Sequence, residues 1–394
     1  MKIFNKNFFL MLIFQFGLIQ LLSAQQNYQK KAGTFPKPDR IVILIYENHS
    51  YNSIVGAAAA SHINNLINDT ANTALFTQSF GIEHPSQPNY IDLFSGGNQG
   101  VTNDNVPTGT PYSTPNLARQ LIDSGKTFAT YSEDMPSVGY NGASSGYYAR
   151  KHNPVANWMG TGINQVPTTT NLPFTSFPTS NFFQLPTVSF VVPNLVNDMH
   201  NGTDPTAIQN GDSWLLNYMN PFLTWAMNNN SLFILTFDED DNSSSNKITT
   251  LFYGPMVKGG KYSNTINHYS ILRLIEDIYN LPYAGAAAGA GVIDYCWKSK
   301  VNTGIYENVK GDCKLVVNPN PASSVLEFTC NKIFYEPVDV IITDAVGKQV
   351  GSYQIVNSNK LSINTSSLKP GMYFYKIVSE NNVMHSGRFV INQH

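Results

Sequence analysis

Hydrophobic runs alternate with amphipathic stretches from about residue 40 to residue 295. These runs are rich in β-branched and aromatic residues and almost continuous in hydrophobicity, as is typical of strands buried on both faces. Stretches with helical spacing separate them. The alternation predicts an α/β fold, a doubly wound and mainly parallel sheet with helices on both sides. The predicted strands are 41–46, 128–131, 187–192, 232–237 and 250–253, and the predicted helices include 57–67, 115–124 and 214–228.

The pattern changes after about residue 312. Short alternating strands are separated by turn sequences, such as Asn-Pro-Asn-Pro at 318–321 and Lys-Pro-Gly at 369–371. This pattern is typical of a small all-β sandwich. We therefore expect one domain over 25–300, a linker over 301–311 and a second domain over 312–394.

The N-terminus has the pattern of an export signal. Lys2 and Lys6 precede an apolar stretch over 8–22, which ends in small residues at Ser23 and Ala24. The stretch predicts a signal peptide over 1–24, because it is too short and too weakly flanked for a good membrane span. No other apolar run reaches membrane length, so we expect no stable membrane insertion of the mature protein.

Charge and cysteine content add only two constraints on partners and on disulfides. Only 13% of residues are charged and the formal net charge is -2. No basic patch stands out, which argues against a nucleic-acid partner. The cysteines, Cys296, Cys313 and Cys330, allow one disulfide and one leftover thiol in an oxidising compartment, and the sequence leaves their pairing open.

Polar side chains follow several of the predicted strands. Glu47 and Asn48 follow the first, Asp198 and His200 follow the third, and Asp238-Glu239 follows the fourth. In parallel α/β sheets, ligands bind beyond the carboxyl ends of the strands. Carboxylate and amide oxygens suit a hard divalent cation, and histidine extends the choice to zinc or iron. The pattern favours a metal site at this edge, although each segment alone also fits a solvated strand end or an acidic loop.

Two predicted helix starts carry further candidate residues. In the segment HPSQPNY over 84–90, Pro88 fits the first turn of a helix that Gly96-Gly97 ends, which places Ser86 at the helix N-terminus. A serine there is often a simple cap, but beside a cation its hydroxyl becomes a nucleophile. His268 begins a second predicted helix, which runs to Pro282.

Five motifs in this order resemble the phosphoesterase family of bacterial acid phosphatases and nonspecific phospholipases C, within the alkaline phosphatase superfamily. They are ENHSY at 47–51, HPSQPNY at 84–90, NDMH at 197–200, FDED at 237–240 and NHYSILRLIED at 267–277. The resemblance covers about residues 38–285 and implies an alkaline phosphatase-like fold. It implies that Ser86 is the nucleophile and that Glu47, Asn48, Asp238 and Glu239 hold the metal. His84, His152, Asp198, His200 and His268 would then line the phosphate site or hold a second ion. One or two ions fit, and calcium, magnesium, zinc and iron all remain open.

The C-terminal segment resembles the sorting domain of proteins exported by the type IX secretion system. The matching residues are VVNPNP at 316–321, ITDAVG at 342–347, LKPGMY at 368–373 and GRFVI at 387–391. This resemblance implies the secretion machinery as a partner and a secreted or cell-surface location.

Together these features predict a secreted, metal-dependent phosphoesterase. The preferred activity is that of an acid phosphatase that hydrolyses phosphomonoesters through a phosphoserine intermediate. Two alternatives stay open: a phospholipase C acting on phospholipids, and a non-catalytic surface binding protein on the same fold. The segment HPSQPNY lacks the arginine of a sulfatase motif, which argues against that class.

Overall fold

The computed structural model describes residues 35–298, 315–334, 337–379 and 382–392. The chain divides into two compact units, Met1–Lys298 and Ser299–His394. Each is described by itself. The predicted signal peptide, the predicted linker and Cys313 lie outside the described residues.

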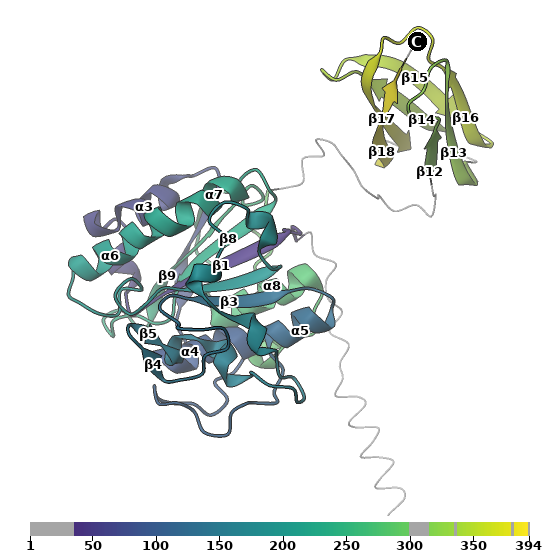
Figure 1. Ribbon diagram of the computed structural model, residues 1–394. Coiled ribbons are helices and arrows are strands. Elements are labelled where there is room, and N and C mark those ends of the chain that lie inside the picture. The colour runs from purple at the N-terminus through teal and green to yellow at the C-terminus, as the bar shows by residue number, and fades with distance from the viewer. Residues whose placement is uncertain (1–34, 299–314, 335–336, 380–381, 393–394) are drawn as a thin grey trace, which may run out of the picture. The chain divides into compact units, whose positions relative to one another are not determined.

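The first unit is built on one mixed, mainly parallel sheet with the strand order β10-β2-β9-β8-β1-β7-β3-β6, and β11 also pairs with β2 (Figure 1). β1 lies between β8 and β7 and is parallel to both, whereas β9 is antiparallel to β8 and β2. The strands are β1 (Arg40–Tyr46), β2 (Thr73–Phe80), β3 (Phe128–Ser132), β6 (Asn171–Pro173), β7 (Val188–Val192), β8 (Ser231–Phe237), β9 (Lys247–Tyr253), β10 (Gly260–Tyr262) and β11 (Ile266–Asn267). A separate two-stranded hairpin joins β4 (Ser144–Ser145) to β5 (Tyr148–Ala149).

Helices cover both faces of this sheet, and the side chains of β1 show why (Figure 1). Ile41, Ile43 and Ile45 join one buried cluster, while the alternate side chains join another. The first cluster includes residues of α4 (Ser86–Ser95), α5 (Leu117–Asp123) and α8 (His268–Tyr279), and the second includes residues of α3 (Ser61–Asn68), α6 (Thr206–Trp214) and α7 (Asn220–Ala226). This two-sided burial confirms the predicted doubly wound α/β fold.

Local sequence accounts for the ends of the helices that matter most. α4 ends at Gly96, whose φ of 71° lies in the left-handed region that glycine adopts without strain. α8 begins after Asn267, whose side chain accepts a hydrogen bond from the Ser270 amide in a capping box.

One predicted helix begins far earlier than expected. The helix predicted over 214–228 starts at Thr206 as α6, passes through a π-helical turn over Leu215–Met219 and continues as α7. Pro221 lies in the first turn of α7, where its missing N–H removes a regular hydrogen bond, and the π-helical turn lies directly before it.

The second unit has two antiparallel sheets around one apolar core, which confirms the predicted all-β module. One sheet has the order β12-β13-β16 and the other β15-β14-β17-β18. Leu326, Phe328, Val340 and Phe389 are among the buried core residues. The strands are β12 (Leu315–Asn318), β13 (Val325–Phe334), β14 (Val338–Thr343), β15 (Gln349–Ile355), β16 (Ser358–Asn364), β17 (Gly371–Ser379) and β18 (Asn382–Ile391).

Among the described residues, no helix has both the length and the hydropathy needed to cross a bilayer. Cys296 is a buried free thiol in the first unit, and Cys330 of the second unit is disulfide-bonded.

Candidate active site

The carboxyl ends of β1, β7 and β8 come together at one edge of the sheet. The backbone N–H of Asp238 donates to the carbonyl of Tyr46 at 3.0 Å, and that of Glu47 donates to the carbonyl of Asp198 at 2.9 Å. The polar residues that follow three separate strands are therefore joined by backbone hydrogen bonds as well as by side chains.

Ser86 lies at the centre of this edge. It is the first residue of α4, and the capping position is taken by Pro85. The Ser86 hydroxyl is buried and lies 2.9 Å from Oε2 of Glu47 and 3.1 Å from Oε1 of Glu239. The side chain of Ser86 therefore faces two carboxylates and does not cap the helix.

Glu47 is fully buried and contacts side chains from three directions. Its Oε1 accepts a short hydrogen bond from the Tyr90 hydroxyl, and its Oε2 lies 3.1 Å from Nε2 of His152. The Tyr90 and His152 rings stack at 5.1 Å, with 12° between their planes. Burial alone would raise the pKa of Glu47, but the charge and hydrogen bond of His152, together with the Tyr90 hydroxyl, lower it to about 2.

His152 bridges two carboxylates. Its Nδ1 lies 3.1 Å from Oδ2 of Asp198, opposite the contact with Glu47. Burial lowers the pKa of His152, but Glu47 and Asp198 outweigh it and raise the pKa to about 9. Asp198 also accepts the His200 amide at Oδ1, so both of its oxygens are engaged within the protein. That arrangement is typical of a residue that orients a functional histidine.

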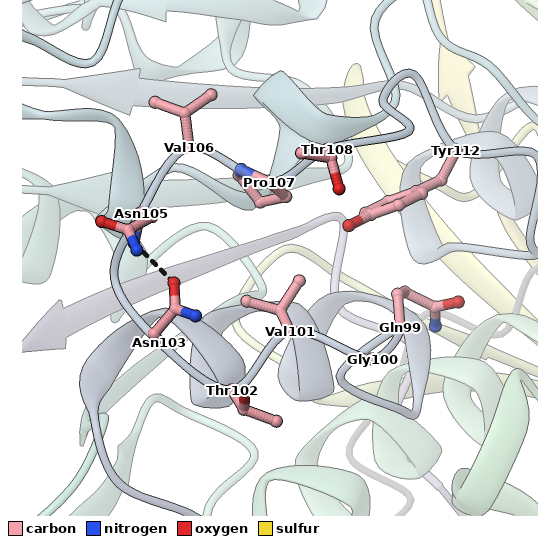
Figure 2. A pocket seen from close by; sticks show the side chains of 10 residues that line it. All are labelled: Gln99, Gly100, Val101, Thr102, Asn103, Asn105, Val106, Pro107, Thr108 and Tyr112. Atoms are coloured by element: carbon pink, nitrogen blue, oxygen red, sulfur yellow. Dashed lines mark hydrogen bonds between the residues drawn. The ribbon is translucent and has the colours of Figure 1, made fainter.

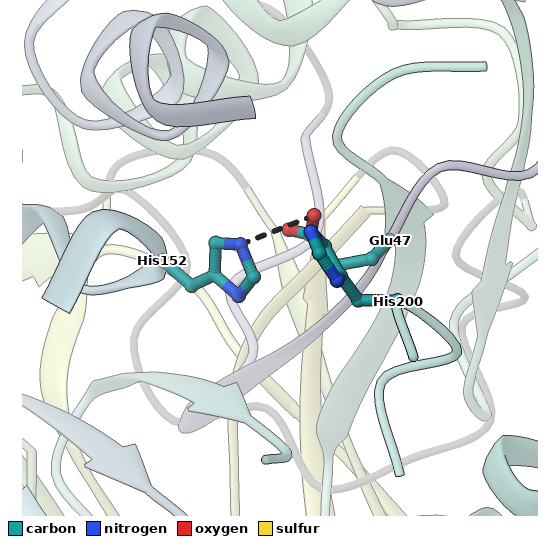
Figure 3. Close-up of side chains that lie close together, drawn as sticks. All are labelled: Glu47, His152 and His200. Carbon is teal, nitrogen blue, oxygen red and sulfur yellow. Dashed lines mark ion pairs between the residues drawn. The ribbon is translucent and has the colours of Figure 1, made fainter. Parts of the chain in front are cut away.

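Glu47, His152 and His200 form a compact group of ligand atoms (Figure 3). One atom from each lies within 4.8 Å of the others, close enough to share a metal ion. Lys151 Nζ lies 3.1 Å from Nε2 of His200 and 2.8 Å from Oδ2 of Asp104. A lysine ammonium therefore borders this group.

Asn48, Asp238 and Glu239 form the other side of the cluster. The backbone N–H of Asn48 donates to Oδ1 of Asp238 at 3.1 Å, and the side-chain Nδ2 of Asn48 donates to Oε1 of Glu239 at 2.8 Å. Oδ1 of Asn48 and Oδ2 of Asp238 are buried and have no hydrogen-bond partner among the described residues. Two unpaired oxygens beside further carboxylates fit a divalent cation, because buried acceptors are otherwise satisfied.

The pKa values of Asp238 and Glu239 agree with a site that binds a cation. Burial, followed by the nearby charge of Glu47, raises the pKa of Asp238 well above its usual range and that of Glu239 to about 8. Several buried carboxylates at one place repel each other, and a bound cation would offset that repulsion.

His84 and His268 lie at the rim and at the base of the cluster. His84 contacts Glu239 through Nδ1 and Asp240 through Nε2, and its side chain is about one-third exposed. His268 begins α8, is buried, and places Nε2 2.6 Å from the carbonyl of Asp238. Because Nε2 donates to that carbonyl, Nδ1 is the unprotonated nitrogen, and it has no hydrogen-bond partner in the described part of the chain. Burial lowers the pKa of His268 to about 4.

The structure thus brings every side chain predicted for the site into one cluster. It also adds residues that the sequence did not single out. Tyr90 reads as an ordinary apolar position of α4, and Lys151 and Asp104 come from loops without a motif of their own. Glu133 reads as a surface carboxylate, yet it accepts hydrogen bonds from the Asn194 amide and the Asn197 side chain, which fixes the loop that carries Asp198. The available signals were the place of Tyr90 within the segment HPSQPNY and the position of Lys151 directly before His152.

A pocket of about 280 Å³ lies along the loop between α4 and α5 (Figure 2). Its lining residues are uncharged and include Val101, Val106 and Tyr112. Gln87, which follows Ser86, anchors this loop through hydrogen bonds to the carbonyls of Asn103 and Asn105. The pocket therefore borders the active-site helix, but the reactive groups lie outside its lining.

A buried serine hydroxyl among carboxylates and histidines at the edge of an α/β sheet fits a hydrolase that acts on esters. The model of the phosphoesterase family matches residues 59–282, and that of a secretion system C-terminal sorting domain matches residues 316–392. The chain belongs to the phosphoesterase family, as expected from its motifs, and is a hydrolase of phosphate esters. It carries a C-terminal sorting domain.

Two curated relatives are phosphatases by name. The phosphatidylinositol-3-phosphatase of Mycobacterium tuberculosis is 43% identical over 267 residues, covering 68% of this chain and 85% of the relative. An acid phosphatase of Aspergillus fumigatus is 30% identical over 235 residues, so the chain spans about half of that longer protein, 52% of its length. Among solved structures, a lipoteichoic acid synthase of Listeria monocytogenes aligns with a TM-score of 0.47 at 11% identity, covering 66% of this chain and 78% of that one.

Proposed function

We propose that the protein is a secreted, metal-dependent phosphomonoesterase of the acid phosphatase type that acts through a phosphoserine at Ser86. The observation that carries this proposal is the buried Ser86 hydroxyl between Glu47 and Glu239, at the N-terminus of α4. The names of the relatives support a monoester substrate, since both the mycobacterial and the fungal proteins are named as phosphatases. This favours an acid phosphatase over a phospholipase C.

A divalent cation fits the cluster. Glu47, Asn48, Asp238 and Glu239 would hold it, because they supply oxygens and two of these are buried without partners. His268 offers a free Nδ1 nearby, and His152 and His200 offer nitrogens beside Glu47. When bound, the cation would favour the ionised serine and stabilise negative charge on the phosphate oxygens. Asp198 is better suited to orienting His152 than to binding the ion, since both of its oxygens are engaged.

The protein side chains then perform two displacements at phosphorus. In the first, Ser86 Oγ forms a bond to phosphorus, its proton passes to a neighbouring carboxylate, and the bond to the alcohol oxygen breaks. A histidine of the cluster, His84, His152 or His200, gives the departing oxygen its proton. His268 is unsuited to this step, because its one N–H is donated to the carbonyl of Asp238. In the second, the water oxygen forms a bond to phosphorus while the bond from Ser86 Oγ to phosphorus breaks. The histidine takes a proton from the water, and the carboxylate returns its proton to Ser86. Ser86 lies at the N-terminus of α4, where the helix dipole is positive and favours the negative charge throughout.

The export route forms part of the proposal. The sorting domain over 316–392 supports delivery to the cell surface or beyond, and the predicted signal peptide over 1–24 would provide the first step of export. The partner is then the type IX secretion machinery.

The test is the Ser86→Ala variant, with p-nitrophenyl phosphate as substrate. We expect kcat to fall by about three orders of magnitude or more, because the nucleophile is lost. Zinc or magnesium content should remain near that of the wild type, since the proposed ligands are intact. Rapid acid quenching of the wild type should leave phosphate on Ser86. Full activity in the variant would refute the serine mechanism.

A further inference from the structure

Lys151 lies at the active site but has no part in the scheme above. Its neighbour Arg150 is buried and contacts Asn141 and the carbonyl of Ala156, so Arg150 holds its own loop together. Lys151 extends towards the reaction centre and places Nζ 3.1 Å from Nε2 of His200. Two adjacent basic residues therefore have different roles, and the position of Lys151 calls for an explanation.

The Lys151 side chain is held in place from the side away from His200. Oδ2 of Asp104 lies 2.8 Å from Nζ, and Oδ1 of the same residue accepts the Gln87 amide at 3.0 Å. Asp104 thus ties Lys151 to the residue that follows Ser86 on α4. The side chain of Lys151 is 18% exposed, so its head is positioned inside the site and is not a mobile surface charge.

The charge of the cluster explains why a fixed cation is useful here. Glu47, Asp198, Asp238 and Glu239 are buried carboxylates at one sheet edge. A phosphomonoester is a dianion near neutral pH, and these carboxylates would repel it once they are ionised around the proposed cation. An ammonium group has three N–H donors, and the contacts with Asp104 and His200 engage two of them. One donor remains for a phosphate oxygen.

We propose that Lys151 binds a non-bridging oxygen of the substrate phosphate and makes the enzyme selective for phosphomonoester dianions over phosphodiester monoanions, with Asp104 as its positioning residue. This inference rests on the proposed phosphatase function. A diester lacks the second negative charge that Lys151 would offset. The preference should therefore depend on the charge of residue 151 and should be separable from the chemistry at Ser86.

The experiment compares two substrates with the same leaving group in the metal-loaded full-length enzyme, p-nitrophenyl phosphate and methyl p-nitrophenyl phosphate. For Lys151→Gln we expect kcat/KM for the monoester to fall about 10- to 100-fold, as for the loss of one charge-assisted hydrogen bond. The loss for the diester should be several times smaller. Inhibition by inorganic phosphate should weaken by about 10-fold or more, whereas Lys151→Arg, which keeps the charge, should recover part of the preference.

Lys261→Gln is the matched control. Lys261 is exposed on β10, which pairs with the N-terminal half of β2, away from the end that leads to Ser86. The Lys261→Gln substitution removes the same charge, and it should leave kcat/KM for both substrates and the inhibition by phosphate unchanged. Asp104→Asn should weaken phosphate inhibition less than Lys151→Gln does, because the ammonium remains but loses its anchor.

The possible outcomes separate the two proposals. If the wild type hydrolyses neither ester, the phosphatase function itself is wrong. Suppose instead that the wild type hydrolyses p-nitrophenyl phosphate. If Lys151→Gln then lowers kcat/KM equally for both substrates, or leaves phosphate inhibition unchanged, the selective role of Lys151 is overturned and the phosphatase function stands. Near-ultraviolet circular dichroism of each variant checks that the fold is intact.

Discussion

At the scale of single residues, the site depends on charges that compensate one another without solvent. Glu47 keeps a low pKa in a fully buried position because His152 and Tyr90 contact its two oxygens and His200 adds a favourable charge. The sequence predicted Glu47, Ser86 and Asp238 as site residues because strand ends and helix starts have local signals. It did not identify Tyr90 or Asp104, since their roles arise from contacts between segments far apart in the chain.

Removing the His152 side chain should destabilise the protein as well as lower its activity. His152→Ala leaves Glu47 and Asp198 buried without their shared partner, and breaking a buried ion pair costs about 3 kcal/mol or more. We expect the free energy of unfolding in EDTA, measured by urea denaturation at pH 7, to fall by about that amount. His62→Ala, on the half-exposed surface of α3, is the control and should change it by less than about 0.5 kcal/mol. If the free energy of unfolding of His152→Ala equalled that of the wild type, Glu47 would not be charged in the folded protein.

At the scale of elements, α4 and α8 deliver Ser86 and His268 to the site and pack against each other. The start of α8 and the end of α4 at Gly96 could be predicted from capping and glycine signals. The early start of α6 and the strand β2 could not. β2 contains polar residues among its apolar ones, and its place beside β9 depends on tertiary pairing. The helical segment from Thr206 lacks a side-chain cap to mark its start.

The junction between α4 and the loop after α8 has no room for a side chain. A Cβ on Gly96 would lie 2.1 Å from the carbonyl oxygen of Ala284, and the φ of Gly96 is +71°. Gly96→Ala should therefore lower the free energy of unfolding by about 2 kcal/mol or more, through both the clash and the backbone strain. Gly97→Ala is a matched control, because the nearest atom to its Cβ would be 3.7 Å away. Equal urea midpoints for the two variants would contradict this account of the junction.

Asp92 joins the same two helices and should make stability depend on pH. The Tyr269 hydroxyl donates to its Oδ1 at 2.8 Å, while Oδ2 has no hydrogen-bond partner among the described residues. Burial raises the pKa of Asp92 to about 7 despite that hydrogen bond, and the charge of Glu83 adds to the rise. The folded state therefore holds a proton that the unfolded chain releases above about pH 4. The contribution is complete below pH 4 and is lost as the pH rises through about 7.

Asp92→Asn tests this dependence, because asparagine stays neutral and still accepts the Tyr269 hydrogen bond. We expect the variant to match the wild type at pH 4 and to exceed its free energy of unfolding at pH 8 by a few kcal/mol. Urea denaturation in EDTA at several pH values measures the difference. Asp123→Asn, at an exposed position of α5, should show no gain at pH 8. A constant difference between pH 4 and pH 8 would mean that Asp92 is charged throughout.

At the scale of the whole molecule, the candidate active site and the sorting domain lie in separate units of the chain. The residues of the candidate active site all lie in the unit Met1–Lys298, and the match to the sorting domain lies in the unit Ser299–His394. Each unit has its own buried core. The change from α/β to all-β patterning was visible in the sequence, because the period of the apolar residues changes with the type of secondary structure.

This separation predicts that residues 25–298 hydrolyse phosphomonoesters without the second unit. A domain with its own core is expected to fold alone, so kcat/KM for p-nitrophenyl phosphate should stay within about twofold of that of the full-length protein. In the native host the truncated protein should remain inside the cell envelope, while the full-length protein reaches the surface or the medium, as activity in fractionated cells would show. Full-length Ser86→Ala is the control, since it should be exported normally but be inactive. A truncated protein that is folded yet inactive would assign the second unit a catalytic role, and a truncated protein found at the surface would remove its role as an export signal.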